Sequence, residues 1–126
     1  MSMPDVLIVD DDRLLRTMLK DALADVPCNV READSGDAAI VAIAEKRPAV
    51  LLLDLIMPGK SGLDLLKTFS QHGPAMRIVV ISSLDAESLV QQALKDGAHG
   101  FLSKPFHPLD VQNVVRAALE AAEGTP

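Results

Sequence analysis

The stretch Val50-Leu51-Leu52-Leu53-Asp54 consists of four aliphatic residues followed by a carboxylate. Its apolar residues do not alternate with polar ones, which is typical of a strand buried on both faces of a parallel sheet. Val6–Val9 and Ile78–Ile81 are similar runs, and Phe101–Leu102 is a shorter one. Because helical patterns separate these runs, we expect an α/β fold in which helices cover both faces of a parallel sheet.

Strands and helices are expected to alternate along the whole chain. The expected strands are Val6–Val9, Asn29–Ala33, Val50–Leu53, Arg77–Ile81 and Gly100–Ser103. The expected helices are Arg13–Ala24, Gly36–Lys46, a segment from the N-cap Ser61 to His72, Asp85–Asp96, and Pro108 to about Glu123. Asn29–Ala33 is the most polar strand, so we expect it near an edge of the sheet. In the first helix the spacing predicts one apolar face made of Leu14, Leu15, Met18, Leu19, Ala22 and Leu23.

Length and composition favour one cytoplasmic domain. The chain has 126 residues, 48% of them hydrophobic, and a net charge of −6. This acidic balance argues against direct binding to nucleic acid, which needs patches of Lys and Arg. Cys28 is the only cysteine, so an intrachain disulfide is excluded. No apolar run has the form of a signal peptide or a membrane span, so membrane insertion is not expected.

Polar side chains follow the expected strands. The acidic run Asp10-Asp11-Asp12 comes after the first strand, Asp54 after the third, Ser82 after the fourth and Lys104 at the end of the fifth. The carboxyl ends of parallel strands meet at one sheet edge, where ligands bind in open α/β folds. Acids, a hydroxyl and a lysine at this edge predict a site for a divalent cation and a phosphoryl group. Asp54 is the candidate nucleophile towards phosphorus.

Each of these residues also has a plain structural interpretation. Asp12 suits the N-cap of the first helix, and Ser82 and Lys104 carry little information individually. Three successive acids, however, repel one another unless a cation neutralises them. Asp54 follows an apolar run, so its carboxylate is expected to be partly desolvated at a cost that a functional role would explain.

The motifs Val9-Asp10-Asp11, Asp54-x-x-Met57-Pro58-Gly59, Ser82 and Lys104-Pro105-Phe106 together resemble the receiver domain of two-component response regulators. The resemblance covers residues 4–123, and it leaves 124–126 as a short tail. It implies a doubly wound, flavodoxin-like fold with five parallel strands in the order 2-1-3-4-5 and five helices on both faces.

The resemblance also implies a role for each matching residue. Asp54 would accept a phosphoryl group from a histidine kinase or a histidine phosphotransfer protein. Asp11 and Asp54 would bind Mg²⁺ directly, with Mn²⁺ as an alternative, together with the backbone carbonyl of Ile56. Asp10 would contribute through a water molecule, and Lys104 would pair with the phosphoryl group.

Other implied features concern the switch. Ser82 would move towards the phosphoryl group, Phe101 would be the switch aromatic, and the Lys104–Pro105 bond would be cis. The fourth helix, fifth strand and fifth helix would form the surface that binds a downstream protein, in a monomer or a phosphorylation-dependent dimer. The chain would then be a signalling phosphoacceptor rather than an enzyme.

Two positions depart from the common pattern in a way that bears on this switch. Ile56 and Leu84 each lie two residues beyond a site residue, where polar side chains could orient an attacking water. Because both side chains are apolar, we expect slow self-dephosphorylation.

Other classes of protein fit the residues less well. A haloacid-dehalogenase-type phosphatase needs a general acid two residues after its nucleophile, where this chain has Ile56. A flavodoxin-like flavin carrier needs a phosphate loop in place of the acidic run and aromatic residues to stack on the flavin, and the chain has no Trp or Tyr. A receiver that serves only as a binding module would not need the Asp, Ser and Lys set.

The form of the output is a separate question. Met1 and the polar tail favour a stand-alone receiver. The alternative is a receiver fragment of a larger regulator with a DNA-binding or enzymatic output domain.

Overall fold

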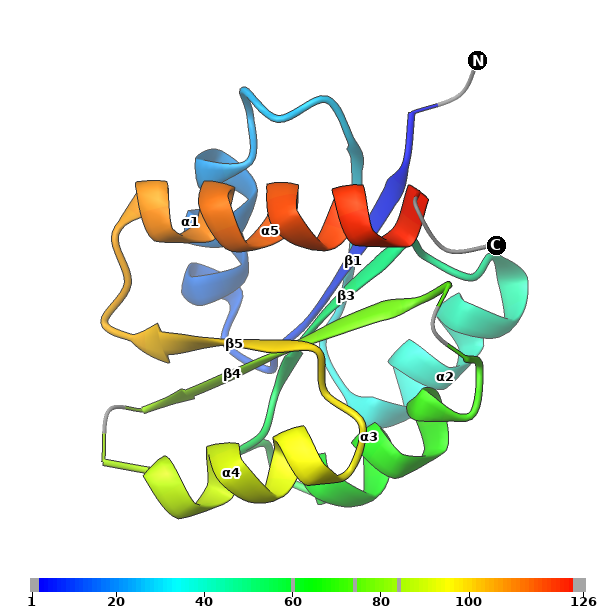
Figure 1. Ribbon diagram of the computed structural model, residues 1–126, viewed down its shortest axis with the longest axis vertical. Coiled ribbons are helices and arrows are strands. Elements are labelled where there is room, and N and C mark those ends of the chain that lie inside the picture. The colour runs from blue at the N-terminus through cyan, green and yellow to red at the C-terminus, as the bar shows by residue number, and fades with distance from the viewer. Residues whose placement is uncertain (1–2, 60, 74, 84, 124–126) are drawn as a thin grey trace.

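Five parallel strands form one sheet in the order β2-β1-β3-β4-β5 (Figure 1). The structure is a computed structural model, and it describes residues 3–59, 61–73, 75–83 and 85–123. The strands are β1 (Asp5–Val9), β2 (Asn29–Ala33), β3 (Val50–Asp54), β4 (Arg77–Ser83) and β5 (Gly100–Lys104). The helices of the described residues are α1 (Arg13–Ala22), α2 (Gly36–Glu45), α3 (Gly62–Ser70), α4 (Glu87–Lys95) and α5 (Pro108–Glu123). The predicted fold class and sheet order are confirmed.

Helices cover both faces of the sheet, α1 and α5 on one and α2, α3 and α4 on the other (Figure 1). The core between the sheet and α1 and α5 includes Leu19, Leu23, Val111 and Val115. The core on the opposite face includes Ala39, Ile43, Leu66, Phe69 and Ala93. Full burial of one such Leu, Val or Phe side chain contributes about 1.5–3 kcal/mol, so these two layers supply most of the driving force for folding.

The burial of each strand follows its place in the sheet. Every residue of β1 and β3 is buried, because helices cover both faces of these central strands. β2 lies at the edge and is mostly exposed or half-buried, as its polar sequence predicted.

The predicted apolar face of α1 is partly wrong. Leu19, Ala22 and Leu23 are buried, but the side chains of Leu14 and Met18 are 68% and 46% exposed. Leu14 and Met18 each precede a residue of the inner face by one position, which is a rotation of about 100° around a helix. They therefore lie on the flank of α1 rather than against the sheet.

β3, β4 and β5 each continue beyond their apolar runs, β3 through Asp54. β4 continues through Ser82 and Ser83, and β5 continues through Lys104. Ser82 pairs in register with Ser103, and Ser83 with Lys104. The polar residues predicted to follow these strands are thus their last paired residues, and the sheet fixes their backbones.

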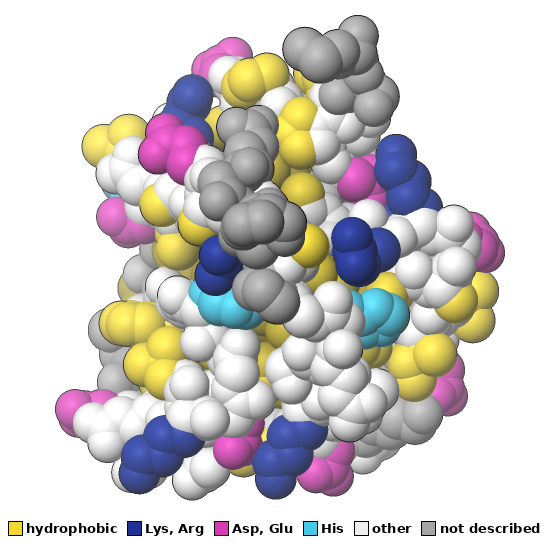
Figure 2. Space-filling view, turned by 45° about the vertical axis from the view of Figure 1, so that its right-hand side comes forward, with side chains coloured by type: hydrophobic (Ala, Val, Ile, Leu, Met, Phe, Trp, Pro, Cys, Tyr) yellow, Lys and Arg dark blue, Asp and Glu magenta, His cyan; other side chains and the backbone are white. Residues whose placement is uncertain are grey.

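The face of the molecule drawn in Figure 2 is mixed in charge. Side chains of Lys and Arg are interspersed there with those of Asp and Glu, with hydrophobic side chains between them. Within the described part of the chain, no helix combines the length and the apolar character that crossing a bilayer requires.

Candidate functional site

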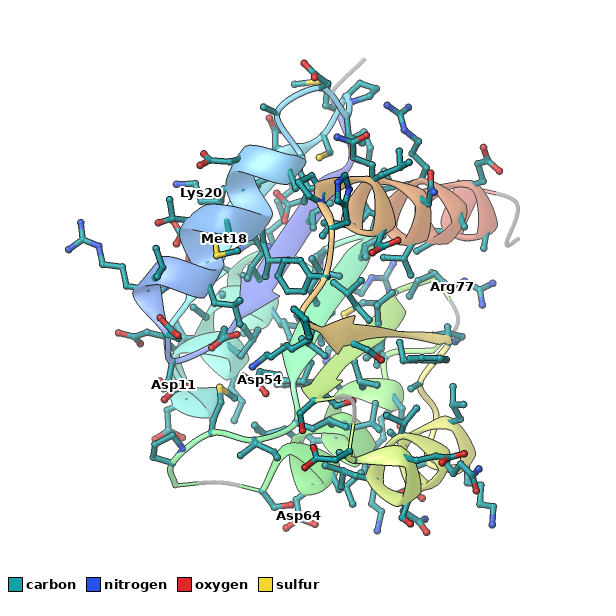
Figure 3. The ribbon with its side chains drawn as sticks, turned by 90° about the vertical axis from the view of Figure 1, so that its left-hand side faces the viewer. Asp11, Met18, Lys20, Asp54, Asp64 and Arg77 are labelled. Carbon is teal, nitrogen blue, oxygen red and sulfur yellow. The ribbon has the colours of Figure 1, made fainter. Side chains whose placement is uncertain are left out.

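The predicted site residues lie at the carboxyl edge of the sheet. Asp54 is the last residue of β3, and Asp10 and Asp11 directly follow β1, the neighbouring strand. Lys104 ends β5, and it reaches Asp54 across β4. Figure 3 shows Asp11 and Asp54 at one end of the sheet, whereas Arg77, at the start of β4, lies at the other end.

Three carboxylates form a cluster at this edge. One oxygen atom from each of Asp10, Asp11 and Asp54 lies within 4.8 Å of the others. Asp10 is completely buried, Asp54 is 2% exposed, and Asp11 is exposed. The cluster therefore has two buried carboxylates at its base and one at its mouth.

Both carboxylate oxygens of Asp54 have partners. The backbone N–H of Ile56 donates to Oδ1 at 2.9 Å, and Nζ of Lys104 donates to Oδ2 at 3.0 Å. The first bond closes the turn after β3, and the second is an ion pair whose lysine is one-third exposed. These contacts hold the Asp54 carboxylate in one orientation at the base of the cluster.

Asp10 is held less completely. Its Oδ1 accepts the backbone N–H of Asp12 at 2.9 Å, but its Oδ2 is buried without a hydrogen-bond partner among the described residues. The pKa of Asp10 is raised from 3.8 to about 6, mainly by burial and also by the charge of Asp54, against the lowering effects of the Asp12 N–H and Lys104.

These observations fit a hard divalent cation. Mg²⁺ takes oxygen ligands, retains several waters and binds through one or two carboxylates. The cluster offers such oxygens. Oδ2 of Asp10 has no hydrogen-bond partner among the described residues, so it can accept a hydrogen bond from water or bind an ion. A cation there would also reduce the repulsion between the buried carboxylates of Asp10 and Asp54.

Ser82 and Phe101 differ in exposure. Ser82 is 1% exposed, and its Oγ has no hydrogen-bond partner among the described residues. Phe101 is half exposed, and it lines hollows on both sides, towards α4 and towards α5. The Lys104–Pro105 peptide bond is cis.

Asp12 has the structural role that its position suggested. Its Oδ1 accepts the backbone N–H groups of Leu14 at 2.9 Å and Leu15 at 3.4 Å, which caps α1. The acidic run thus divides into two cluster residues and one helix cap.

Ile56 and Leu84 are the two positions expected to control dephosphorylation. The side chain of Ile56 is 62% exposed beside the site, and it is apolar. Leu84, the second such position, lies outside the described residues.

Sequence reasoning missed Arg16. Its Nη1 donates to the backbone carbonyl of Asp10 at 2.8 Å, and its Nε donates to Glu32 at 3.0 Å. Neither the bond to the Asp10 carbonyl, six residues away, nor the bond to Glu32, sixteen residues away, has a characteristic spacing, so no sequence pattern would have identified this residue.

Comparison with known proteins agrees with this geometry. The family model for the response regulator receiver domain matches residues 6–116. The chemotaxis protein CheY of Thermotoga maritima is 36% identical over 82% of this chain and 87% of its own length. The nitrate/nitrite response regulator NarL of Escherichia coli is 37% identical over 94% of this chain, which spans only 55% of that protein.

A solved structure is also similar. The receiver domain of NtrX from Brucella abortus superposes with a TM-score of 0.87 and 31% identity, over 92% of this chain and 98% of that one. A family model that spans most of the chain, the sheet order and the carboxylate cluster lead to one conclusion: this chain belongs to the family of response regulator receiver domains.

Proposed function

We propose that this receiver domain is a phosphorylation-dependent switch in which Asp54 accepts the phosphoryl group. The observation that carries the proposal is the Asp54 carboxylate, nearly buried at the end of β3 and held by Lys104 beside Asp10 and Asp11. A carboxylate fixed in this way is a suitable nucleophile towards phosphorus.

In the proposed reaction, an oxygen of Asp54 forms a bond to the phosphorus atom of a phosphohistidine. The N–P bond breaks, and the imidazole nitrogen keeps its electron pair. The donor is a histidine kinase or a histidine phosphotransfer protein. Lys104, already within hydrogen-bond distance of Asp54, is suited to neutralise negative charge on the transferred oxygens.

Asp11, Asp54 and the backbone carbonyl of Ile56 would hold Mg²⁺, with Asp10 acting through water. Mn²⁺, which accepts similar oxygen ligands, is an alternative. When bound, the cation supplies positive charge that offsets the charge of the carboxylates and of the incoming phosphoryl group. The domain itself provides the oxygens and their fixed positions.

The switch would begin at Ser82 and Lys104. The hydroxyl of Ser82 has no hydrogen-bond partner among the described residues and could donate to a phosphoryl oxygen, and Ser82 and Lys104 belong to the paired strands β4 and β5. Movement of these strand ends would alter Phe101 and the surface formed by α4, β5 and α5, to which a downstream protein binds.

We propose residues 4–123 as the boundaries of this domain, with 124–126 as a tail outside the described residues. The proposed working form is a cytoplasmic stand-alone receiver, either a monomer or a phosphorylation-dependent dimer. The relatives include CheY, which matches over 87% of its own length, and longer regulators such as NarL and NtrC, of which this chain spans 55% and 25%.

The test is intact-mass spectrometry after incubation with Mg²⁺ and acetyl phosphate. We expect one labile phosphoryl group on the wild type and on Asp64→Ala, an acidic control in α3 away from the site (Figure 3). Asp54→Ala, or omission of Mg²⁺, should abolish the gain. If neither acetyl phosphate nor a histidine phosphotransfer donor modifies the wild type, the domain acts instead as a phosphorylation-independent binding module.

A further inference from the structure

Arg16 links the loop after β1 to the neighbouring strand β2. Its guanidinium comes from the first turn of α1 and is 13% exposed. Nη1 donates to the backbone carbonyl of Asp10 at 2.8 Å, while Nε donates to Oε1 of Glu32 in β2 at 3.0 Å. One planar side chain therefore binds the start of the acidic loop and the edge strand at the same time.

The contact matters because Asp10 is completely buried. Its backbone N–H donates to the carbonyl of Ala33 at 3.1 Å, and its Oδ1 accepts the N–H of Asp12. The backbone carbonyl of Asp10 has Arg16 as a side-chain donor, and a buried carbonyl that loses its donor is destabilising. Loss of Arg16 would thus free one of the three points that hold this residue.

We propose that Arg16 is a positioning residue for the divalent-cation site: by holding the Asp10 carbonyl it keeps Asp10 and Asp11 at the right distance from Asp54. The inference rests on the proposed function, because it assumes that the carboxylate cluster binds a cation. Groups that orient metal ligands from outside often change metal affinity by 10- to 100-fold when they are removed.

The sign of the effect separates positioning from simple electrostatics. Arg16 is a positive charge close to a site for a cation. If only its charge mattered, its removal would make the site more negative and would strengthen Mg²⁺ binding. If Arg16 positions the loop, its removal weakens binding despite the more favourable charge.

Lys20 provides a matched control. Its Nζ donates to the other oxygen of Glu32 at 3.0 Å, so it carries the same charge and shares the same partner as Arg16. Figure 3 shows Lys20 farther along α1 from the Asp11 end. Among the described residues Lys20 bonds to Glu32 and not to Asp10, and its side chain is 47% exposed.

The experiment is isothermal titration calorimetry of the full chain with Mg²⁺ at fixed pH and ionic strength, since the chain has no Trp or Tyr to report binding by fluorescence. For Arg16→Met we expect the Kd to rise roughly tenfold. For Lys20→Met we expect a Kd equal to or slightly below that of the wild type.

Arg16→Lys is the second variant, because it retains the charge and is the less disruptive change. Lysine lacks the planar guanidinium that can bond to two partners at once. The Kd of Arg16→Lys for Mg²⁺ should therefore lie between those of the wild type and Arg16→Met. Circular dichroism in EDTA establishes that each variant is folded at the temperature of the titration.

Two outcomes would overturn the inference. If folded Arg16→Met binds Mg²⁺ with a Kd at or below the wild-type value, Arg16 does not position the site. If Arg16→Met does not fold, the same result for Arg16→Lys has the same meaning. Equal weakening in Lys20→Met would assign the effect to the Glu32 network. If the wild type itself does not bind Mg²⁺, the proposed function fails as well, and this result is separate from the other two.

Discussion

Asp5 and Asp10 are both buried carboxylates of β1 and its end, yet their surroundings differ. Asp5 is 5% exposed and forms an ion pair with Arg31 at 2.6 Å. Asp10 is completely buried, has a raised pKa, and has one carboxylate oxygen that meets no hydrogen-bond partner in the described part of the chain. Because burial of a charge is costly unless it is compensated, Asp5 is a structural residue, whereas Asp10 is suited to a ligand that arrives later.

At the scale of single residues, we predict that Asp10→Asn stabilises the protein when Mg²⁺ is absent. The folded-state pKa of Asp10, about 6, is above its ordinary value of 3.8. The charge therefore opposes folding fully above pH 6, and this penalty disappears as the pH falls through 6 towards 4. At pH 7.5 in EDTA we expect a Tm increase of about 5–10 °C, corresponding to about 2 kcal/mol.

Thermal unfolding followed by circular dichroism at pH 7.5 and pH 5 would measure this effect. The increase should shrink at the lower pH, and Mg²⁺ should stabilise the variant less than it stabilises the wild type. Asp11→Asn is the control, since Asp11 is exposed and its replacement should change the metal-free Tm little. An unchanged or lower Tm for Asp10→Asn at pH 7.5 contradicts the prediction.

We also predict that Ile56→Asn shortens the lifetime of the phosphorylated protein. The side chain of Ile56 is exposed next to Asp54 and cannot hydrogen-bond to water, whereas an amide there could orient an attacking water molecule. We expect dephosphorylation to accelerate roughly threefold or more, measured as the decay of the phosphorylated mass. Ile56→Leu, which remains apolar, should decay like the wild type; an unchanged or longer lifetime for Ile56→Asn would disprove the idea.

At the scale of elements, the connection from β3 to α3 is unusually close. A Cβ atom on Gly62, the first residue of α3, would lie 2.3 Å from the backbone oxygen of Leu55. The absence of a side chain at Gly62 thus allows α3 to begin directly against the backbone of Leu55, the residue that follows Asp54. Backbone atoms cannot yield as a flexible side chain can, so this packing depends on glycine.

We therefore predict that Gly62→Ala costs about 3 kcal/mol or more of unfolding free energy. Gly59→Ala is the comparison, because a Cβ there meets nothing within 4 Å and only its φ of +90° disfavours alanine, at about 1 kcal/mol. Urea denaturation followed by circular dichroism would measure both. If both variants lose the same unfolding free energy, α3 can move away from Leu55 at little cost, and the prediction is wrong.

At the scale of the whole molecule, the site and the proposed output surface of α4, β5 and α5 share the strand β5. Ser82 and Lys104 stand at the ends of β4 and β5, and Phe101 lies three residues before Lys104 on the same strand. Phe101 borders both α4 and α5 through the hollows beside it. A displacement of the strand ends therefore has a short path to this surface, while β2 and α2 lie at the opposite edge of the sheet.

We predict that phosphorylation changes hydrogen exchange locally. Peptides that cover the end of β4, α4 and β5 should change severalfold in exchange rate, because the phosphoryl group interacts differently with the two states of these segments. Peptides from β2 and α2 should not change. Exchange measured by mass spectrometry with Mg²⁺ and acetyl phosphate provides the test, with Asp54→Ala as control; uniform protection across the domain would indicate general stabilisation rather than a switch.

The sequence alone was sufficient for the fold class and for the positions of the candidate residues. Continuous apolar runs such as Val50–Leu53 mark strands buried on both faces, and the polar residue after each run marks the carboxyl edge. These signals are local, because each depends on a few adjacent residues. For the same reason, the helix limits were accurate only to one or two residues, as at α1 and α3.

The tertiary structure decided what adjacent residues cannot encode. The exposure of Leu14 and Met18 depends on which side of α1 meets the sheet. The division of the acidic run, with Asp12 as a cap and Asp10 buried without a full set of partners, depends on the path of the loop. Arg16 bonds to the Asp10 carbonyl and to Glu32 of β2 together only when α1 lies beside β2, because these groups share no periodicity and meet only in the folded chain.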